Sequence, residues 1–234
     1  MVHDLRYKFE QNKRVVHVLF ILLSLYFLIG CNSDNQNETI DLSAVVDKPV
    51  SNKIQDLASK EDDQKGHYEF NGGQLKLVDN GEHVINYSFD GKDTNNVKFQ
   101  GKTINDTYGA KVVVYGNVGA FVSIKAPEEH VKEYFTTFVK ELGRSDSMHI
   151  ESTAAATVND KVKSILLEAY PGILKAYKGD IPGRLLYPQK LFWKKGNVRY
   201  FLTLDPIGDN VNLKIDIISE KALKDRIVMG YHVH

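Results

Sequence analysis

The chain has 234 residues, of which 42% are hydrophobic and 26% charged, and its 30 basic residues balance its 30 acidic ones. This composition is typical of a globular protein and argues against a strongly basic nucleic-acid-binding protein and against an acidic disordered chain. The single cysteine excludes a disulfide framework within the chain and a cysteine-rich metal centre.

The first thirty residues have the three zones of an export signal. Lys13 and Arg14 precede an apolar run over residues 15–29, and polar residues follow it. The run has about 15 residues, fewer than the roughly 20 that a membrane-spanning helix needs. We therefore predict a signal peptide over residues 1–30, with an uncleaved signal anchor as the alternative.

The end of the apolar run, Leu28-Ile29-Gly30-Cys31, resembles the lipobox of bacterial lipoproteins. The resemblance covers the signal region alone. It implies cleavage before Cys31, lipidation of the Cys31 thiol and acylation of the new amino group, and several acyl chains anchor a protein stably. In enterobacterial lipoproteins an aspartate after the cysteine favours the inner membrane, whereas Asn32 follows here. We therefore expect a lipid-anchored protein of the bacterial cell envelope, held in the outer membrane and facing the periplasm.

Residues 31–66 are rich in polar side chains and contain no aromatic residue. A segment of this kind buries too little apolar surface to offset its ordering entropy. We predict that it is a flexible tether, with one short helical turn near residues 54–60. The folded domain is then expected over residues 67–234.

From residue 67 onward, aromatic and β-branched residues alternate with polar ones in short runs, which predicts strands. Turn-forming residues, Asp79-Asn80-Gly81 first, separate these runs. The predicted strands of this part cover residues 74–78, 83–89, 97–99, 111–115 and 120–125.

The apolar period then becomes helical. Pro127 and two following glutamates favour the first turn of a helix that Gly143 ends. A second helix is expected from residue 159, and Pro171-Gly172 must kink or split it.

The last third returns to strands, which we predict over residues 190–194, 198–204 and 211–218, followed by a short helix over 219–226 and a last strand over 227–233. The predicted class is α+β, with two main helices packed on one face of an antiparallel sheet and a C-terminal antiparallel meander.

No catalytic motif is present in the sequence, and the lipid consumes the only thiol. We assign no catalytic residue, no metal ligand and no cofactor, and we do not expect an enzyme. His232 and His234 share one face of the predicted last strand, but no clear third ligand accompanies them. We interpret Asp205, Asp209 and Asp216 as turn residues rather than as calcium ligands.

Residues 187–201 interleave aromatic and basic side chains. We do not expect nucleic acid as a partner, because an exported lipoprotein rarely meets it. In a structural interpretation, Leu191 and Trp193 face the core while the basic side chains face solvent. In the alternative, a protein partner contacts this stretch, since Trp and Arg are favoured anchors at interfaces. The candidate contact residues are then Trp193, Lys194, Lys195 and Arg199.

These features favour a non-enzymatic, membrane-anchored periplasmic lipoprotein that binds a protein partner. The first version is an immunity lipoprotein that neutralises a toxin, because residues 190–221 resemble small lipoproteins found beside such toxins. The alternatives are a scaffold of envelope assembly and a carrier with a lipid or other apolar ligand between sheet and helices. A hydrolase of peptidoglycan or glycans with scattered catalytic residues is a further alternative.

Overall fold

The computed structural model describes residues 39–89, 94–149, 160–170, 175–176, 185–186, 190–207 and 210–231. The predicted signal peptide, Cys31, His232 and His234 lie outside these ranges. None of the helices in the described part of the chain is long and apolar enough to cross a membrane.

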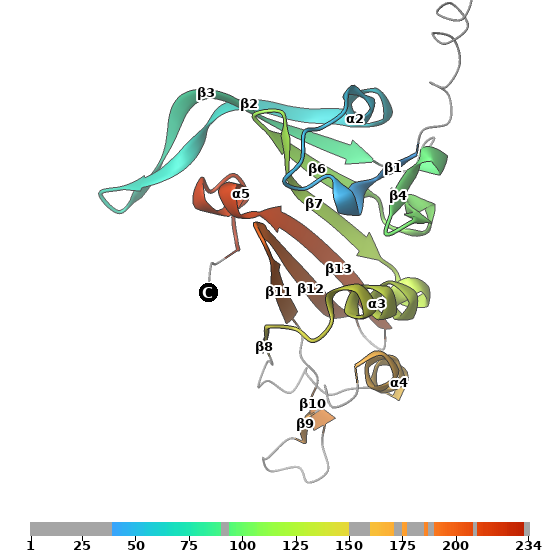
Figure 1. The fold of residues 1–234 in the computed structure, drawn as a ribbon. Helices are drawn as coiled ribbons and strands as arrows, with labels where there is room; N and C mark the ends of the chain where they lie inside the picture. The colour runs from blue at the N-terminus through green and yellow to red at the C-terminus, as the bar shows by residue number, and fades with distance from the viewer. Residues whose placement is uncertain are drawn as a thin grey trace, which may run out of the picture. The chain divides into compact units, whose positions relative to one another are not determined.

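An eight-stranded antiparallel sheet dominates the fold (Figure 1). Its strands pair in the order β2-β3-β6-β7-β13-β12-β11-β8, so the pairing of β7 with β13 joins the two halves of the chain. The bounds in that order are β2 (Ser59–Asn71), β3 (Gln74–Phe89), β6 (Ala110–Tyr115), β7 (Val118–Ala126), β13 (Asn210–Ser219), β12 (Val198–Ile207), β11 (Lys190–Lys195) and β8 (Ser147–His149).

The remaining elements are short strands and helices, and together with the large sheet they confirm the predicted α+β class. A small sheet is formed by β1 (Ile40–Asp41), β4 (Val97–Phe99) and β5 (Lys102–Thr103), and β9 (Lys175–Ala176) pairs with β10 (Leu185–Leu186). The α-helices of the described residues are α2 (Asn52–Leu57), α3 (Glu128–Leu142), α4 (Asp160–Ala169) and α5 (Glu220–Lys224).

The helix α3 packs on one face of the large sheet, as its three- and four-residue apolar spacing predicts. Its buried stripe is Val131, Tyr134, Phe135 and Phe138. Alternate residues of the meander strands, such as Leu202 and Ile215, meet this stripe in one core. The residues between them point to the opposite sheet face, because successive side chains of a strand alternate.

The segment before β2, residues 39–58, belongs to this same core, and residues 59–66 form part of β2, so the prediction of a flexible tether is wrong for residues 39–66. Ile40, Leu42, Val46 and Ile54 are buried in it. The backbone of this segment also pairs with Gly119 of β7: the Asp47 N–H donates to the Gly119 carbonyl over 2.8 Å, and the Gly119 N–H donates to the Lys48 carbonyl over 2.9 Å. A few apolar residues are enough to order this polar segment, because neighbouring elements contribute the other side chains of the core around them.

The turn predicted at Asp79-Asn80-Gly81 is also wrong, since β3 runs through it. The hairpin turn lies at Gly72 and Gly73, whose φ angles are 60° and 81°. Lys65 pairs with His83 and His67 pairs with Val78, so residues 79–82 form a bulge opposite Gly66. Residues that tolerate positive φ suit a bulge as well as a turn.

The C-terminal meander is confirmed, with strands that extend into the link predicted over residues 205–210. The predicted last strand is wrong within the described residues 227–231, which form bends over 227–230 and no strand. Ile227, Val228 and Tyr231 pack instead against the sheet face opposite α3.

Candidate functional site

The distal half of the β2–β3 hairpin, residues 66–78, forms an arm that extends beyond the neighbouring strands (Figure 1). Only residues 84–89 of β3 pair with β6, so the arm has no strand beside β3 in the described structure. The bulge opposite Gly66 marks the point where the arm begins. We refer to residues 66–78 as the arm.

One face of the arm is apolar and largely open to solvent. Phe70 pairs with Leu75 and Tyr68 pairs with Leu77 across the hairpin, so these four side chains share a face. The exposed fractions are 60% for Phe70, 38% for Leu75 and 49% for Leu77. Exposed apolar groups gathered in this way mark interaction surfaces more often than isolated ones do.

The helix α5 and the residues after it hold the arm in place. The Tyr68 N–H donates to the Asp225 carbonyl over 3.3 Å. The guanidinium of Arg226 lies 5.3 Å from the centre of the Phe70 ring, within cation–π range. The arm is therefore positioned by the C-terminal part of the domain rather than by its own hairpin alone.

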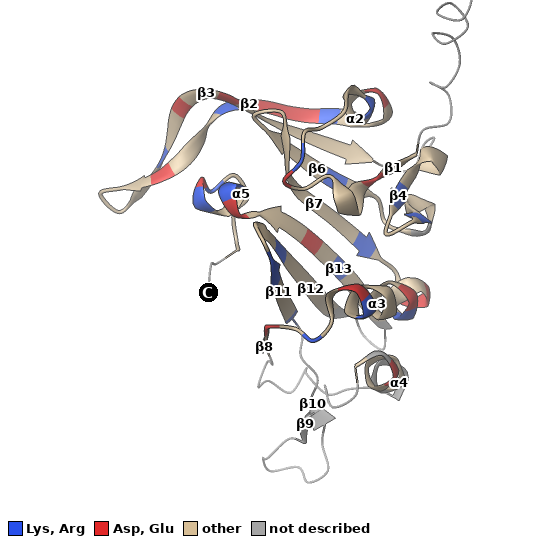
Figure 2. Ribbon diagram, viewed as in Figure 1, with Lys and Arg blue, Asp and Glu red and all other residues tan. Residues whose placement is uncertain are grey.

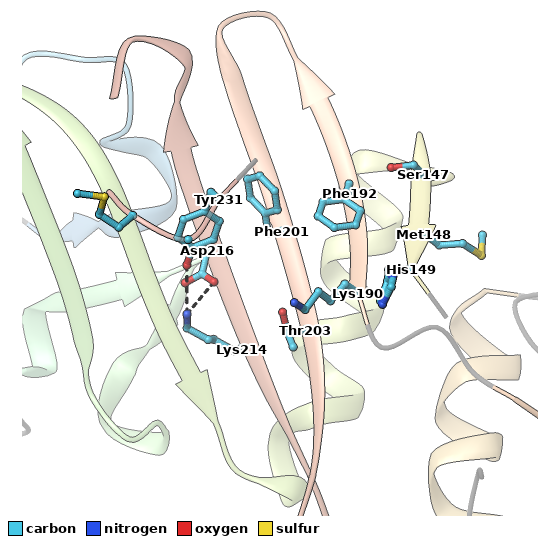
Figure 3. A pocket seen from close by; sticks show the side chains of 12 residues that line it. Ser147, Met148, His149, Lys190, Phe192, Phe201, Thr203, Lys214, Asp216 and Tyr231 are labelled. Carbon is cyan, nitrogen blue, oxygen red and sulfur yellow. Dashed lines mark hydrogen bonds and ion pairs between the residues drawn. The ribbon is translucent and has the colours of Figure 1, made fainter. Parts of the chain in front are cut away.

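A pocket of about 720 Å³ lies on the sheet face opposite α3, beside the residues that follow α5 (Figure 3). Two cross-strand rows of side chains from β8, β11, β12 and β13 line it. The first row is Ser147, Phe192, Phe201 and Asp216, and the second is His149, Lys190, Thr203 and Lys214. Met229 and Tyr231 close one side.

Asp216 is 2% exposed, although it carries a carboxylate. Its Oδ2 forms an ion pair of 3.0 Å with the Lys214 ammonium, which also donates to the Tyr231 hydroxyl over 3.2 Å (Figure 3). Burial, together with the nearby charge of Asp216, raises the pKa of Tyr231 above its ordinary value. Lys214 therefore contacts both Asp216 and Tyr231 at this side of the pocket.

The aromatic residues of the pocket form a continuous edge-to-face cluster. The ring centres of Phe192 and Phe201 are 5.2 Å apart, and those of Phe201 and Tyr231 are 5.0 Å apart. Such pairs hold rings in fixed orientations. The pocket therefore has a rigid apolar wall beside its charged groups.

The predicted contact residues do not form one surface. Trp193 is 1% exposed and belongs to the core with α3, so the prediction that it contacts a partner is wrong, and the structural interpretation of Leu191 and Trp193 is confirmed. Lys194 and Lys195 are exposed at the β11–β12 turn. Arg199 lies on the opposite sheet face from Trp193 and forms an ion pair of 3.4 Å with Glu220.

The histidines are dispersed among the described residues. His67 faces Glu69 at 3.0 Å, His83 faces Asp63 at 2.7 Å, and His149 lines the pocket. Within the described part of the chain, no three His, Cys, Asp or Glu side chains cluster closely enough to hold a metal ion.

Sequence reasoning missed Asp216, Lys214 and Tyr231. Asp216 is no turn residue, because it lies in the middle of β13 and is buried. The signal was an acidic residue between Ile215 and Ile217 in an otherwise buried strand. A buried carboxylate is costly and therefore needs a partner, so this position could have been singled out.

Comparison with known protein families, with curated proteins and with solved structures finds no match to the chain.

Proposed function

We propose that this chain is a non-enzymatic, lipid-anchored protein of the bacterial cell envelope that binds a toxin in the periplasm and neutralises it. The observation that carries the binding role is the exposed apolar face of the arm. A monomer gains little from leaving Phe70, Leu75 and Leu77 in water, whereas a partner that covers them gains apolar burial and an aromatic anchor.

The charge of the arm favours a protein partner over an anionic membrane surface. Its two charged residues, Glu69 and Lys76, cancel, and both signs occur along the hairpin (Figure 2). Binding to anionic lipid depends on clustered Lys and Arg, each contributing about 1 kcal/mol. An apolar face with one adjacent cation, Arg226, and polar neighbours resembles the core and rim of a protein–protein interface.

An apolar-ligand carrier with its cleft between sheet and helices has less support. The side chains of α3 and the meander strands fill that space in the described residues, as the buried Phe138, Trp193 and Leu202 illustrate. Scaffold and toxin-binding roles share the same surface, and they differ in what the partner does. A test must therefore measure the activity of the partner as well as its capture.

The membrane anchor in this proposal depends on Cys31. Thr39, the first described residue, lies eight residues after it. Eight residues span at most about 28 Å, so a lipid on Cys31 would keep the domain close to the bilayer. Metabolic labelling with an alkyne analogue of palmitate checks this: the wild-type chain should take up label, and Cys31→Ser should not.

The function is tested by capturing exported proteins of the native host and its close competitors on the unlipidated chain, residues 32–234. The proposal predicts one stoichiometric secreted hydrolase or pore-forming protein whose activity stops when the chain binds. Capture of envelope-assembly components would replace the proposal with the scaffold role. An empty eluate would contradict both.

A further inference from the structure

The pocket on the sheet face opposite α3 is lined by other residues than the apolar face of the arm. Its volume of about 720 Å³ falls in the range of small-molecule sites. The aromatic wall of Phe192, Phe201 and Tyr231 stands beside groups of both charges. The two ends of the pocket call for different chemical groups.

The end at Asp216 calls for a hydrogen-bond donor. Asp216 lines the pocket and is 2% exposed, and its Oδ1 atom is buried with no hydrogen-bond partner among the described residues. The Lys214 ammonium forms its ion pair with the other carboxylate oxygen, Oδ2. Buried polar atoms in native proteins are nearly always hydrogen-bonded, so an orphaned carboxylate oxygen points to a donor that a ligand supplies.

The other end calls for an anionic group. Lys190 and His149 are neighbours across β11 and β8, both are exposed, and the Thr203 hydroxyl lies between Lys190 and Lys214 in the same row. The described pocket residues include Asp216 as their one carboxylate, and Lys214 already balances its charge. Lys190 therefore leaves this end positive.

The sheet geometry sets the distance between the two ends. Asp216 and Lys190 are two strands apart and offset by two residues along the strands. With strands about 4.8 Å apart and about 6.6 Å for two residues, their Cα atoms are separated by about 12 Å. An extended tripeptide is about 10 Å long, and side chains reaching inward from both ends close the remaining gap.

We propose that this pocket binds a short peptide of about three residues with free termini. Its amino group donates to Oδ1 of Asp216, its carboxylate contacts Lys190 and His149, and an apolar side chain packs against Phe192 and Phe201. This site is independent of the arm and of the partner proposed above.

The methionines of the chain give a direct readout. The chain has three: Met229 lines the pocket, the side chain of Met148 packs against the core on the α3 face of the sheet, and the third is Met1. The full chain labelled with ¹³C at its methionine methyl groups is titrated with a random tripeptide pool with free termini. The same pool N-acetylated, the same pool C-amidated, and phosphoethanolamine serve as the comparison probes.

The expected result is a saturable shift of the Met229 signal with the free pool, and a smaller shift or none of the Met148 signal, whose side chain lies on the other sheet face. Acetylation and the near-isosteric Asp216→Asn should each weaken apparent binding at least tenfold. Amidation and Lys190→Gln should each weaken it several-fold, whereas Lys195→Gln, at the exposed β11–β12 turn, should not change it. Near-ultraviolet circular dichroism of Trp193 confirms that each variant keeps its fold.

Three results would overturn the proposal. The first is the absence of any shift with the free pool at millimolar concentration. The second is an equal response to the acetylated pool or in a folded Asp216→Asn variant. The third is a response to phosphoethanolamine in place of the peptides, which would assign the site to a lipid headgroup.

Discussion

The indole Nε1–H of Trp193 donates a hydrogen bond of 2.9 Å to the carbonyl oxygen of Gly143. Gly143 ends α3 with a φ of 75°, and the Trp193 ring also meets Phe138 edge-on at 5.7 Å. Trp193 of β11 thus contacts both the C-terminal end of α3, through Gly143, and the Phe138 ring that α3 packs against the sheet. Trp193 is a structural residue that joins helix and sheet.

Replacing Trp193 with Phe should therefore lower the free energy of unfolding by about 2–3 kcal/mol, through a lost hydrogen bond and a cavity beside Phe138. Urea denaturation followed by far-ultraviolet circular dichroism measures the change, since the variant lacks the only tryptophan. Tyr108→Phe, at a ring that is 65% exposed, should change it by less than about 0.5 kcal/mol. A Trp193→Phe variant as stable as this control would refute the joining role.

The segment before β2 should contribute to stability, because Ile54 is 1% exposed in the common core. Ile54→Ala should lower the free energy of unfolding by about 2–4 kcal/mol. Gln55→Ala, at the exposed neighbouring position of α2, should leave it within about 0.5 kcal/mol. Equal stability of the two variants in urea denaturation would restore the tether interpretation.

The bend at the start of the arm depends on Gly66. Its φ is +95°, and a Cβ atom there would lie 2.2 Å from the carbonyl oxygen of Val78, which is backbone and must move. Gly66→Ala should cost about 2–3 kcal/mol and raise amide hydrogen exchange across the arm. Gly73→Ala, with a φ of +81° but open space around it, should cost only about 1 kcal/mol of backbone strain. Similar losses and similar exchange in both variants would argue against a fixed bend.

Tyr231 should make the domain sensitive to alkaline pH. Its folded-state pKa lies above the ordinary value of 10.0, because burial and the Asp216 charge disfavour the phenolate. Above about pH 10 the unfolded chain loses the phenol proton while the folded chain keeps it. The free energy of unfolding therefore stays constant with respect to this group below about pH 10 and falls above it, by up to about 1.4 kcal/mol per pH unit. In urea denaturation between pH 9 and pH 11, Tyr231→Phe should show a shallower loss of stability than the wild type.

Burial also raises the pKa of Tyr115 and Tyr200, so some pH dependence should remain in the Tyr231→Phe variant. Tyr108→Phe is the matched control and should keep the wild-type slope. An unchanged slope in Tyr231→Phe would mean that the phenol is not held neutral by the fold.

Sequence reasoning located the elements whose burial follows a local period. The helix α3 and the hairpins β6–β7 and β11–β12 were found because an apolar stripe or an alternation repeats within each element. The segment over residues 39–58 was missed because Ile40, Leu42 and Ile54 follow no such period. They are buried only because β7 and its neighbours lie beside them.

The candidate site was less accessible to sequence reasoning for a related reason. The pocket combines residues of β8, β11, β12 and β13 with Tyr231 from the segment after α5, and no local pattern connects them. The apolar face of the arm was hidden by the misplaced turn at Asp79-Asn80-Gly81. With that turn removed, the pairing of Phe70 with Leu75 and of Tyr68 with Leu77 follows from the Gly72-Gly73 turn.

The central claim is that the arm binds a toxin which the chain neutralises, and growth protection by arm variants tests it most directly. Cells that produce the captured toxin in the periplasm would also carry the wild-type chain, the double variant Phe70→Ser with Leu77→Ser, or the control Leu167→Ser. Leu167 lies on α4 and is 39% exposed, so it matches the arm residues in character. We predict protection by the wild type and the control and loss of protection by the arm variant at equal protein levels. Undiminished protection by the arm variant would contradict the claim.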